Sequence, residues 1–334
     1  MLHLSVFDLI CSMPLDVTYK SKQFLFVLIK ISIVVCAFYF IYAKIAKNDT
    51  LKVSSFLSFL NQNDAFSPKL ILILLLLSIF NWYFEILKWQ HLVKTIMPIS
   101  FVSALEQSLG SLTASLITPN RIGDYGAKAI YFRKGFRTKI VLLNLLGNLA
   151  QMSITLIFGV IGLLLLIQRY ALDVNFSKLI LLFVTLIAIG FITWLATKHR
   201  LINIKGQTLS TVIDFVKHIP LKRHGLILLL SLLRYAIFSF QFYFLLGLFG
   251  VNMSYFEAMI IISSMYLLAS IVPSISLFDV VVKGSVAVFL FSYVEVNELV
   301  ILSITTLMWL FNFVIPSLFG SYFVLNFKLP KAVA

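Results

Sequence analysis

Long apolar runs with few charges constrain this chain more than any other feature. An α-helix needs about 20 consecutive apolar residues to cross a membrane. Hydrophobic residues make up 60% of the 334-residue chain and charged residues only 12%, against about a quarter charged in ordinary soluble domains. These values exclude a soluble enzyme and a disordered or fibrous chain. The sequence predicts an all-α, polytopic membrane protein that forms one integral membrane domain over residues 1–334.

Six segments are long and apolar enough to cross the membrane, and each is bounded by charge or by Gly and Asn. They cover residues 22–44, 70–88, 140–168, 178–197, 225–250 and 299–326. The first 20 residues contain Asp8, Pro14 and Asp16 and lack the basic-then-apolar order of a cleavable signal peptide. They predict a short interfacial arm, which together with the first span occupies residues 1–46.

Two further apolar stretches are broken by proline and followed at once by charge. Residues 100–118 lead into TPNRIGD (118–124), and residues 254–272 lead into PSISLFD (273–279) and a second apolar piece that ends near Tyr293. Non-helical backbone at membrane depth is tolerated only inside protein or beside a wet cavity. Both stretches therefore predict re-entrant helical hairpins rather than full crossings.

The distribution of basic residues indicates the orientation. With six crossings and an inside N-terminus, 18 of the 27 Lys and Arg residues fall on the cytoplasmic side, 6 fall outside, and Lys30, Arg234 and Lys283 lie within membrane segments. Cytoplasmic loops of membrane proteins carry such an excess. We therefore expect the protein in the cytoplasmic (inner) cell membrane with both termini inside.

The cytoplasmic connection 198–224 carries an amphipathic stripe. Leu209, Val212, Ile213 and Val216 recur at helical spacing and are flanked by Lys and Arg. A helix lying on the anionic inner leaflet and an ordinary linker helix are equally compatible with this pattern.

An internal repeat relates the two broken stretches. SFVSALEQSLGSLTASLITP (100–119) resembles SYFEAMIIISSMYLLASIVP (254–273), and SIFNWY (78–83) resembles SLLRYA (231–236). Beyond each proline an Asp is followed four residues later by a Lys. The copies, about 70–168 and 225–326, would have opposite orientations in the predicted topology, and inverted repeats with broken helices are a transporter architecture.

Ionisable residues at membrane depth are costly and normally face a partner or a cavity. Arg234 lies in mid-span with no nearby neutralising residue, so it must find a carboxylate or a lipid phosphate across the bundle. Helix capping with a local i,i+4 ion pair explains each Asp–Lys pair as well as a functional role does. We predict phosphate-binding residues Arg121, Lys128, Arg234 and Lys283, charge partners Asp124, Asp279, Glu85 and Glu257, and hairpin-break residues Pro119, Gly123 and Pro273.

Other classes of ligand find little support. The net charge of +14 reflects loop residues, and no basic, aromatic-bearing soluble module suits nucleic acid. The 13 acidic residues contain no clustered-carboxylate motif, so we expect neither a metal site nor a cofactor. No nucleotide-binding loop is present, so direct use of ATP is not expected.

Pro119-Asn120-Arg121-Ile122-Gly123-Asp124 resembles the P-G-R-x-G-E signature of the flippase domain of lysylphosphatidylglycerol synthases. The second signature of that family resembles residues 273–279 with Lys283 following, although Ser276, Leu277 and Phe278 replace its glycines. The resemblance covers about 70–325 and implies a flippase-like unit. Because about eight residues follow the last span, we expect a unit without the soluble aminoacyl-transferase domain.

We therefore predict translocation of a phospholipid or other polar-headed, lipid-linked substrate, without enzymatic activity. Membrane lipids are the expected partners, and a second copy of the chain or an envelope-biosynthesis enzyme stays open as a protein partner. One alternative is a membrane-embedded transferase that uses Glu85, Glu106 or Asp124 as an acid or base. The other is a non-transporting accessory subunit of an envelope-lipid or glycan pathway.

Overall fold

The fold is an assembly of long and short α-helices, seen in a computed structural model. The structure describes residues 67–170 apart from 117, 119 and 120, residues 215–271 and 279–329, the short segments 203–204 and 207–208, and isolated positions between 28 and 39. Most of the predicted span 22–44, all of the predicted span 178–197, Pro119, Pro273 and most of the amphipathic stripe lie outside the described residues.

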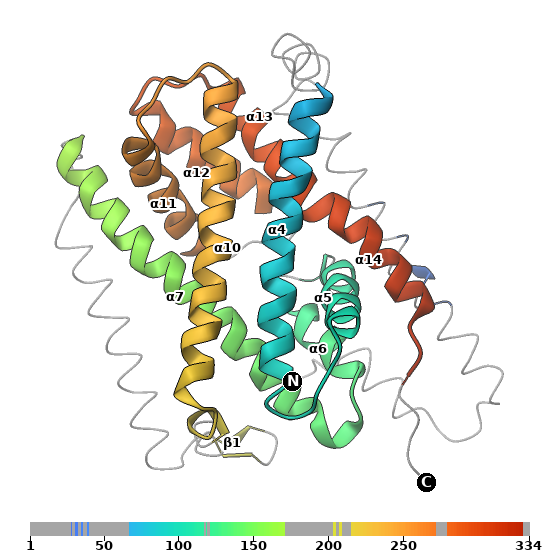
Figure 1. The fold of residues 1–334 in the computed structure, drawn as a ribbon. Coiled ribbons are helices and arrows are strands. Elements are labelled where there is room, and N and C mark those ends of the chain that lie inside the picture. Colours follow the sequence, from blue (N-terminus) through green and yellow to red (C-terminus); the bar gives the residue numbers. More distant parts are fainter. Residues whose placement is uncertain are drawn as a thin grey trace.

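The described elements follow one another in the order drawn in Figure 1. They are α4 (Pro68–Val93), α5 (Phe101–Ser115), α6 (Gly123–Ile130), the 3-10 turn η1 (Lys134–Phe136), α7 (Arg137–Arg169), the antiparallel pair β1 (Asn203–Ile204) and β2 (Gln207–Thr208), α10 (Leu221–Leu248), α11 (Tyr255–Ile271), α12 (Asp279–Ser292), α13 (Glu298–Trp309), the π-helical turn η2 (Leu310–Val314) and α14 (Ile315–Asn326).

Local sequence sets the helix starts. Pro68 opens α4, where its missing N–H costs no hydrogen bond. The Ser100 hydroxyl accepts a hydrogen bond from the Ser103 N–H at the start of α5, and the Asn297 side chain caps α13 in the same way. The first broken stretch therefore folds into a helix within one residue of its predicted start.

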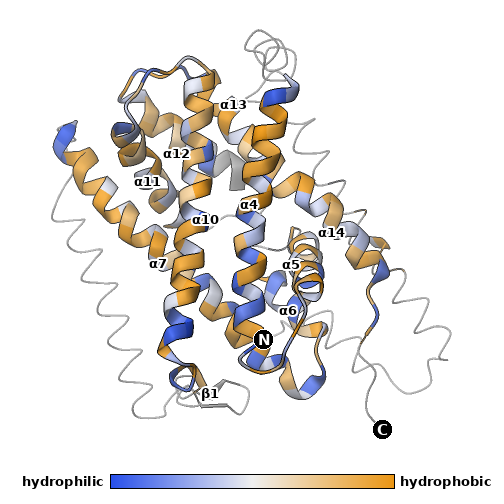
Figure 2. Cartoon of the chain, viewed as in Figure 1, coloured by the Kyte–Doolittle hydropathy of each residue, from blue (hydrophilic) through white to orange (hydrophobic). Residues whose placement is uncertain are grey.

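Four of the predicted spans are confirmed as helices long and apolar enough to cross a membrane. Within the described part of the chain these are α4, the segment Lys134–Arg169, α10 and the segment Glu298–Asn326. The shortest has 26 residues, about 39 Å at 1.5 Å per residue, which exceeds a hydrocarbon core of about 30 Å. Figure 2 shows hydrophobic residues along most of these helices. The chain is an α-helical membrane protein.

The long helices expose apolar side chains as well as burying them. Large hydrophobic residues such as Ile79 on α4, Met152 on α7 and Phe319 on α14 are more than half exposed. Exposed apolar surface of this extent is typical of a lipid-facing exterior. Buried side chains form one large apolar cluster around α10 to α13 and a second around α4, α5 and the first half of α7.

Helices from the two halves of the chain pack against each other in pairs. Helix α4 packs along α10, α5 packs along α14, and α11 packs along α7. The short pair α5–α6 lies near the end where α4 finishes and α10 begins, and the short pair α11–α12 lies toward the opposite end (Figure 1). Each half thus contributes a long helix, two short helices and a further long helical segment. The first short helix of each half, α5 or α11, packs against the last long segment of the other half.

Glycines allow the α7–α11 contact to be close. A Cβ added to Gly162 would clash with the side chain of Ser263 and lie 2.9 Å from the Ile260 carbonyl oxygen. A Cβ added to Gly159 would clash with the side chain of Leu267. Small residues permit such close backbone approach between membrane helices, so the small side chains at these positions determine how α11 sits on α7.

Candidate functional site

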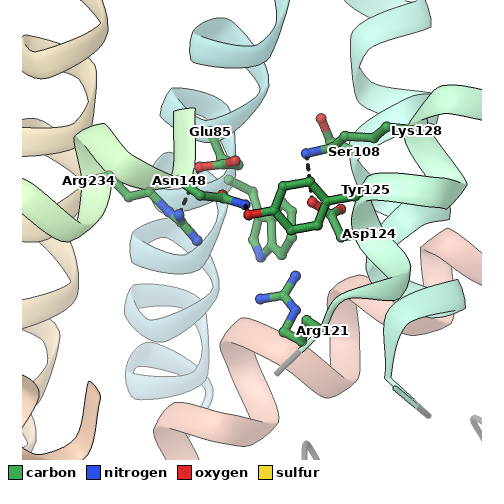
Figure 3. Close-up of a pocket in the computed structure, with 9 residues that line it drawn as sticks. Glu85, Ser108, Arg121, Asp124, Tyr125, Lys128, Asn148 and Arg234 are labelled. Carbon is green, nitrogen blue, oxygen red and sulfur yellow. Dashed lines mark hydrogen bonds and ion pairs between the residues drawn. The ribbon is translucent and has the colours of Figure 1, made fainter. Parts of the chain in front are cut away.

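A polar cavity of about 290 Å³ lies among α4, α5, α6, α7 and α10 (Figure 3). Five of the residues predicted from the sequence line it, namely Glu85, Arg121, Asp124, Lys128 and Arg234. The remaining lining residues are Trp82, Ser108, Tyr125 and Asn148. Residues separated by up to 152 positions, from Trp82 to Arg234, are therefore brought to one site.

Glu85 is the carboxylate that Arg234 requires. An Nη atom of Arg234 on α10 lies 2.8 Å from Oε2 of Glu85 on α4, and Nζ of Lys88 lies 2.7 Å from the same oxygen. Nε of Arg234 also donates to Oδ1 of Asn81, at 3.1 Å. The Lys88 side chain is only 2% exposed, so a buried carboxylate binds two cations at once.

Lys88, which the predicted topology counts among the 18 cytoplasmic Lys and Arg residues, lies within a helix rather than in a loop. The predicted span ended at about this residue, but α4 continues to Val93 and buries the lysine. The apolar pattern fades near residue 88 because the last turns of α4 face other helices through polar side chains. Hydropathy alone does not distinguish such a helix end from a loop.

Asp124 forms a second polar network, in which both of its oxygens are bound. Ser111 donates to Oδ1 at 2.6 Å, and Nδ2 of Asn144 donates to Oδ2 at 2.7 Å. Nζ of Lys128 lies 3.3 Å from Oδ2 and donates to Oδ1 of Asn144 at 2.8 Å. The predicted i,i+4 ion pair is therefore present, and α5 and α7 supply the hydroxyl and amide that hold it.

Aromatic residues complete the surroundings of Lys128. Its Nζ lies 4.6 Å from the centre of the Trp89 ring, a distance at which a cation and an aromatic face attract each other. The indole N–H of Trp89 donates to Oε1 of Gln107 at 2.8 Å. The hydrogen bond to Gln107 thus holds the indole ring beside the ammonium group.

The turn between α5 and α6 presents Arg121. Its φ of 56° is left-handed, a conformation that is uncommon outside glycine. The Gly123 N–H donates to the Thr118 hydroxyl at 2.9 Å, and a Cβ on Gly123 would lie 2.8 Å from Thr118 Cγ2. Glycine is thus required where the turn closes. In Figure 3 the Arg121 guanidinium points into the space between Arg234 and Asp124.

The structure places the other predicted residues outside this cavity. Lys283 lines a second, mostly apolar pocket, with its Nζ 5.7 Å from the centre of the Phe313 ring. Glu257 forms an ion pair with Arg169 near the protein surface, where it also accepts from Ser254. Asp279 begins α12, and its side chain lies outside the described residues. Among the described residues, no group of His, Cys, Asp and Glu side chains could hold a metal ion.

One family model matches the chain, the lysylphosphatidylglycerol synthase TM region, over residues 26–320. The chain belongs to this family. The match includes the helix breaks of both halves and every residue that lines the cavity. No curated protein and no solved structure matched the chain.

In this member of the lysylphosphatidylglycerol synthase TM family, polar residues of α4, α5 and α7 complete the site. The sequence interpretation missed Asn81, Lys88, Gln107 and Asn144, which are all at most 8% exposed. Uncharged amides are common in polar sequences, but within segments this apolar they are a signal of buried contacts. Asn81 and Lys88 lie within about one helical turn of Glu85, a spacing that could have drawn attention to them, whereas the contacts of Gln107 and Asn144 depend on tertiary packing.

Proposed function

We propose that this protein moves a lipid with a phosphate-bearing polar head group across the cytoplasmic membrane. The cavity would hold the head group while the acyl or isoprenoid tails remain in the bilayer. The supporting observation is a polar cavity lined by Arg121, Lys128 and Arg234, to which three helices of membrane-spanning length, α4, α7 and α10, contribute. Ionisable residues in such helices usually mark a substrate path.

Cavity size agrees with a head group rather than a whole lipid. Pockets that enclose drug-sized molecules have volumes of about 300–1,000 Å³, and this cavity of about 290 Å³ lies just below that range. Arg guanidinium groups suit phosphate because they can donate two parallel hydrogen bonds. Arg121 and Arg234 approach the cavity from different elements and could contact a phosphate together.

The architecture supports two re-entrant hairpins. Helices α5, α6, α11 and α12 have 15, 8, 17 and 14 residues, and even the longest would extend only about 26 Å. Each is shorter than a hydrocarbon core of about 30 Å. We propose that the pairs α5–α6 and α11–α12 enter the membrane from opposite sides and turn back within it.

An inverted repeat accounts for the reciprocal packing. Asn81 and Arg234 occupy equivalent places in the two copies and hydrogen-bond to each other, as residues near a pseudo-two-fold axis would. Leu109 and Thr113 on α5 are equivalent to Ser263 and Leu267 on α11. A Cβ added to Gly320 of α14 would clash with Leu109 and Thr113 of α5. In the same way, Cβ atoms added to Gly162 and Gly159 of α7 would clash with Ser263 and Leu267 of α11.

Transport in proteoliposomes tests the function. A phospholipid labelled on its acyl chain should cross protein-containing membranes and become accessible to dithionite in the outer leaflet, whereas protein-free liposomes should remain half-protected. Arg121→Asn removes the guanidinium and retains a residue that tolerates a left-handed φ. It should slow movement about tenfold, and the matched Lys134→Asn, at an exposed position, should not. Equal rates with and without protein would contradict the proposal.

We propose no covalent chemistry at this site. Glu85 and Asp124, the acid–base candidates of the transferase alternative, each bind cations of the protein itself. Their role in the proposed mechanism is to hold those cations near the head group. Product formation from purified protein and an activated donor would support a transferase instead. Stable co-purification of an envelope-biosynthesis enzyme, with Arg121→Asn fully functional, would support an accessory subunit.

A further inference from the structure

We infer that the π-helical turn η2 is a hinge in the proposed transport cycle, and that Trp82 is the positioning residue that couples the cavity to this hinge. The inference rests on the proposed function and specifies how the cavity would control the movement of α14. Three groups of contacts support it, namely those of two carbonyl oxygens at the turn, those of the Asn312 side chain, and those that join η2 and α14 to the α5–α6 side of the cavity.

Pro316 deprives the turn of a backbone hydrogen bond. It follows η2 as the second residue of α14 and has no N–H for the carbonyl four residues earlier, that of Asn312, or five residues earlier, that of Phe311. Side chains of α4 bind both oxygens. The Ser78 hydroxyl donates to the Phe311 carbonyl at 2.6 Å, and the indole N–H of Trp82 donates to the Asn312 carbonyl at 3.0 Å. Neighbouring helices satisfy proline-freed carbonyls in this way at membrane depth, so α4 holds the turn.

Trp82 belongs to the cavity as well as to the turn. Its side chain is among those that line the cavity, and only 7% of the residue is exposed. The hydrogen bond from its indole to Asn312 therefore joins a wall of the cavity directly to a backbone group of the turn. A head group that shifts the indole on entering would break this bond and release the carbonyl oxygen.

The Asn312 side chain makes a second connection, which leads to Arg234. Its Oδ1 accepts from Nδ2 of Asn81 at 2.9 Å, and its Nδ2 donates to Oε1 of Gln241 at 2.9 Å. Oδ1 of Asn81 in turn accepts from Nε of Arg234 at 3.1 Å. Asn81, Gln241 and Asn312 are at most 2% exposed, so water is kept from these bonds. The turn is thus tied to a guanidinium that the proposed mechanism places against the phosphate.

The α5–α6 side of the cavity is joined to the same segment. The ring centre of Phe313 in η2 lies 5.4 Å from Cζ of Arg121, within the range of a cation–π contact. Beyond the turn, α14 packs along α5, and the Thr113 hydroxyl of α5 donates to the Ser317 carbonyl of α14 at 2.8 Å. A bend at η2 would therefore move α5 relative to α4 and α10, and this movement would open or close the cavity between them. Prolines and π-helical turns are common causes of bends in long helices.

Transport by Pro316→Ala tests the hinge. Alanine restores the missing N–H and favours helix more than proline does, so the turn should stiffen and the free energy of unfolding should not fall. Acyl-labelled phosphatidylglycerol should cross proteoliposomes about tenfold more slowly than with the wild-type protein, an increase of about 1.4 kcal/mol in the barrier. The matched Pro220→Ala, at the exposed N-cap of α10, should transport at the wild-type rate. A purely structural proline would not combine slower transport with undiminished stability.

Distances between spin labels measure the hinge without transport. Both native cysteines are first replaced by serine, and labels are attached after Ile79→Cys on α4 and Tyr322→Cys on α14, at positions at least 60% exposed. Trp82→Phe keeps an aromatic wall and removes the N–H that binds the Asn312 carbonyl. We expect a broader distance distribution in Trp82→Phe than in the otherwise wild-type protein, and a narrower one in Pro316→Ala.

Two results would overturn the inference. One is transport at the wild-type rate by a folded Pro316→Ala protein, and the other is a wild-type distance distribution in Trp82→Phe. If phosphatidylglycerol crosses no faster with the wild-type protein than in protein-free liposomes, the proposed function fails, and the distances alone decide whether η2 bends under the control of Trp82. If Pro316→Ala does not fold, as judged by size-exclusion chromatography, the distances in Trp82→Phe decide in the same way.

Discussion

The carboxylate of Glu85 should contribute far more to the free energy of unfolding than a more exposed carboxylate that also forms an ion pair. Its Oε2 contacts Lys88 at 2.7 Å and Arg234 at 2.8 Å, and the side chains of Glu85, Lys88 and Arg234 are 12%, 2% and 22% exposed. Removing one partner from a buried ion pair costs about 3–5 kcal/mol, since it leaves an uncompensated buried charge. We therefore expect Glu85→Gln to lower the free energy of unfolding by about 3–5 kcal/mol.

Two further variants separate the ion pair from other effects of the mutation. Glu257→Gln breaks the ion pair between Glu257, whose side chain is 30% exposed, and Arg169, whose side chain is 49% exposed. This variant should lower the free energy of unfolding by less than about 1 kcal/mol. Lys88→Met in the Glu85→Gln background removes the stranded cation and should recover part of the loss. Coupling between such neighbours is about 0.5–3 kcal/mol.

Reversible unfolding in mixed micelles titrated with SDS measures all of these differences. The reasoning fails if Glu85→Gln and Glu257→Gln cost the same, since burial would then not govern the energy. It also fails if the double variant loses as much free energy of unfolding as the Glu85→Gln and Lys88→Met single variants together, because the two groups would then not interact.

The remaining predictions concern packing, hydrogen bonding and topology. Gly162→Val should destabilise the α7–α11 contact by about 1–3 kcal/mol through overpacking, measured by the same titration, whereas Gly225→Ala, with open space around its Cβ, should not destabilise the fold. Asn312→Leu should cost about 1–3 kcal/mol because Asn81 and Gln241 lose their amide partner, and a cost below 0.5 kcal/mol would show that this network contributes little. In inside-out and right-side-out vesicles, Lys134→Cys should react with a membrane-impermeant thiol reagent from the cytoplasmic side and Asn252→Cys from the exterior; reaction from one common side would exclude opposed hairpins.

Helix positions and charge pairs within one helix could be predicted because they depend on local patterns. The run of apolar residues predicted each end of α4, α7 and α10 to within five residues, since burial in lipid requires a continuous apolar segment. The Asp124–Lys128 pair followed from the i,i+4 spacing. The proline-broken stretch before TPNRIGD correctly indicated where α5 gives way to α6.

Contacts between distant segments could not be predicted in the same way. Mid-span Arg234 implied a partner across the bundle, but several carboxylates were compatible with that role. Glu257 was an equally plausible charge partner from its sequence position, and it lies at the surface beside Arg169. Only the packing of α4 along α10 brings Glu85 within 2.8 Å of the guanidinium.

Amino-acid order alone established the membrane class and the identity of the costly charges, because the low dielectric of a bilayer penalises each charge wherever its helix lies; the internal repeat stays a prediction. Tertiary structure decided which charges share a cavity and which side chains satisfy them. That division has a physical cause: hydropathy and helical periodicity are local properties, whereas an ion pair at 2.8 Å depends on the relative placement of two helices. The roles of Gly159 and Gly162 likewise depend on tertiary structure, because their close contacts are with α11, about 100 residues further along the chain.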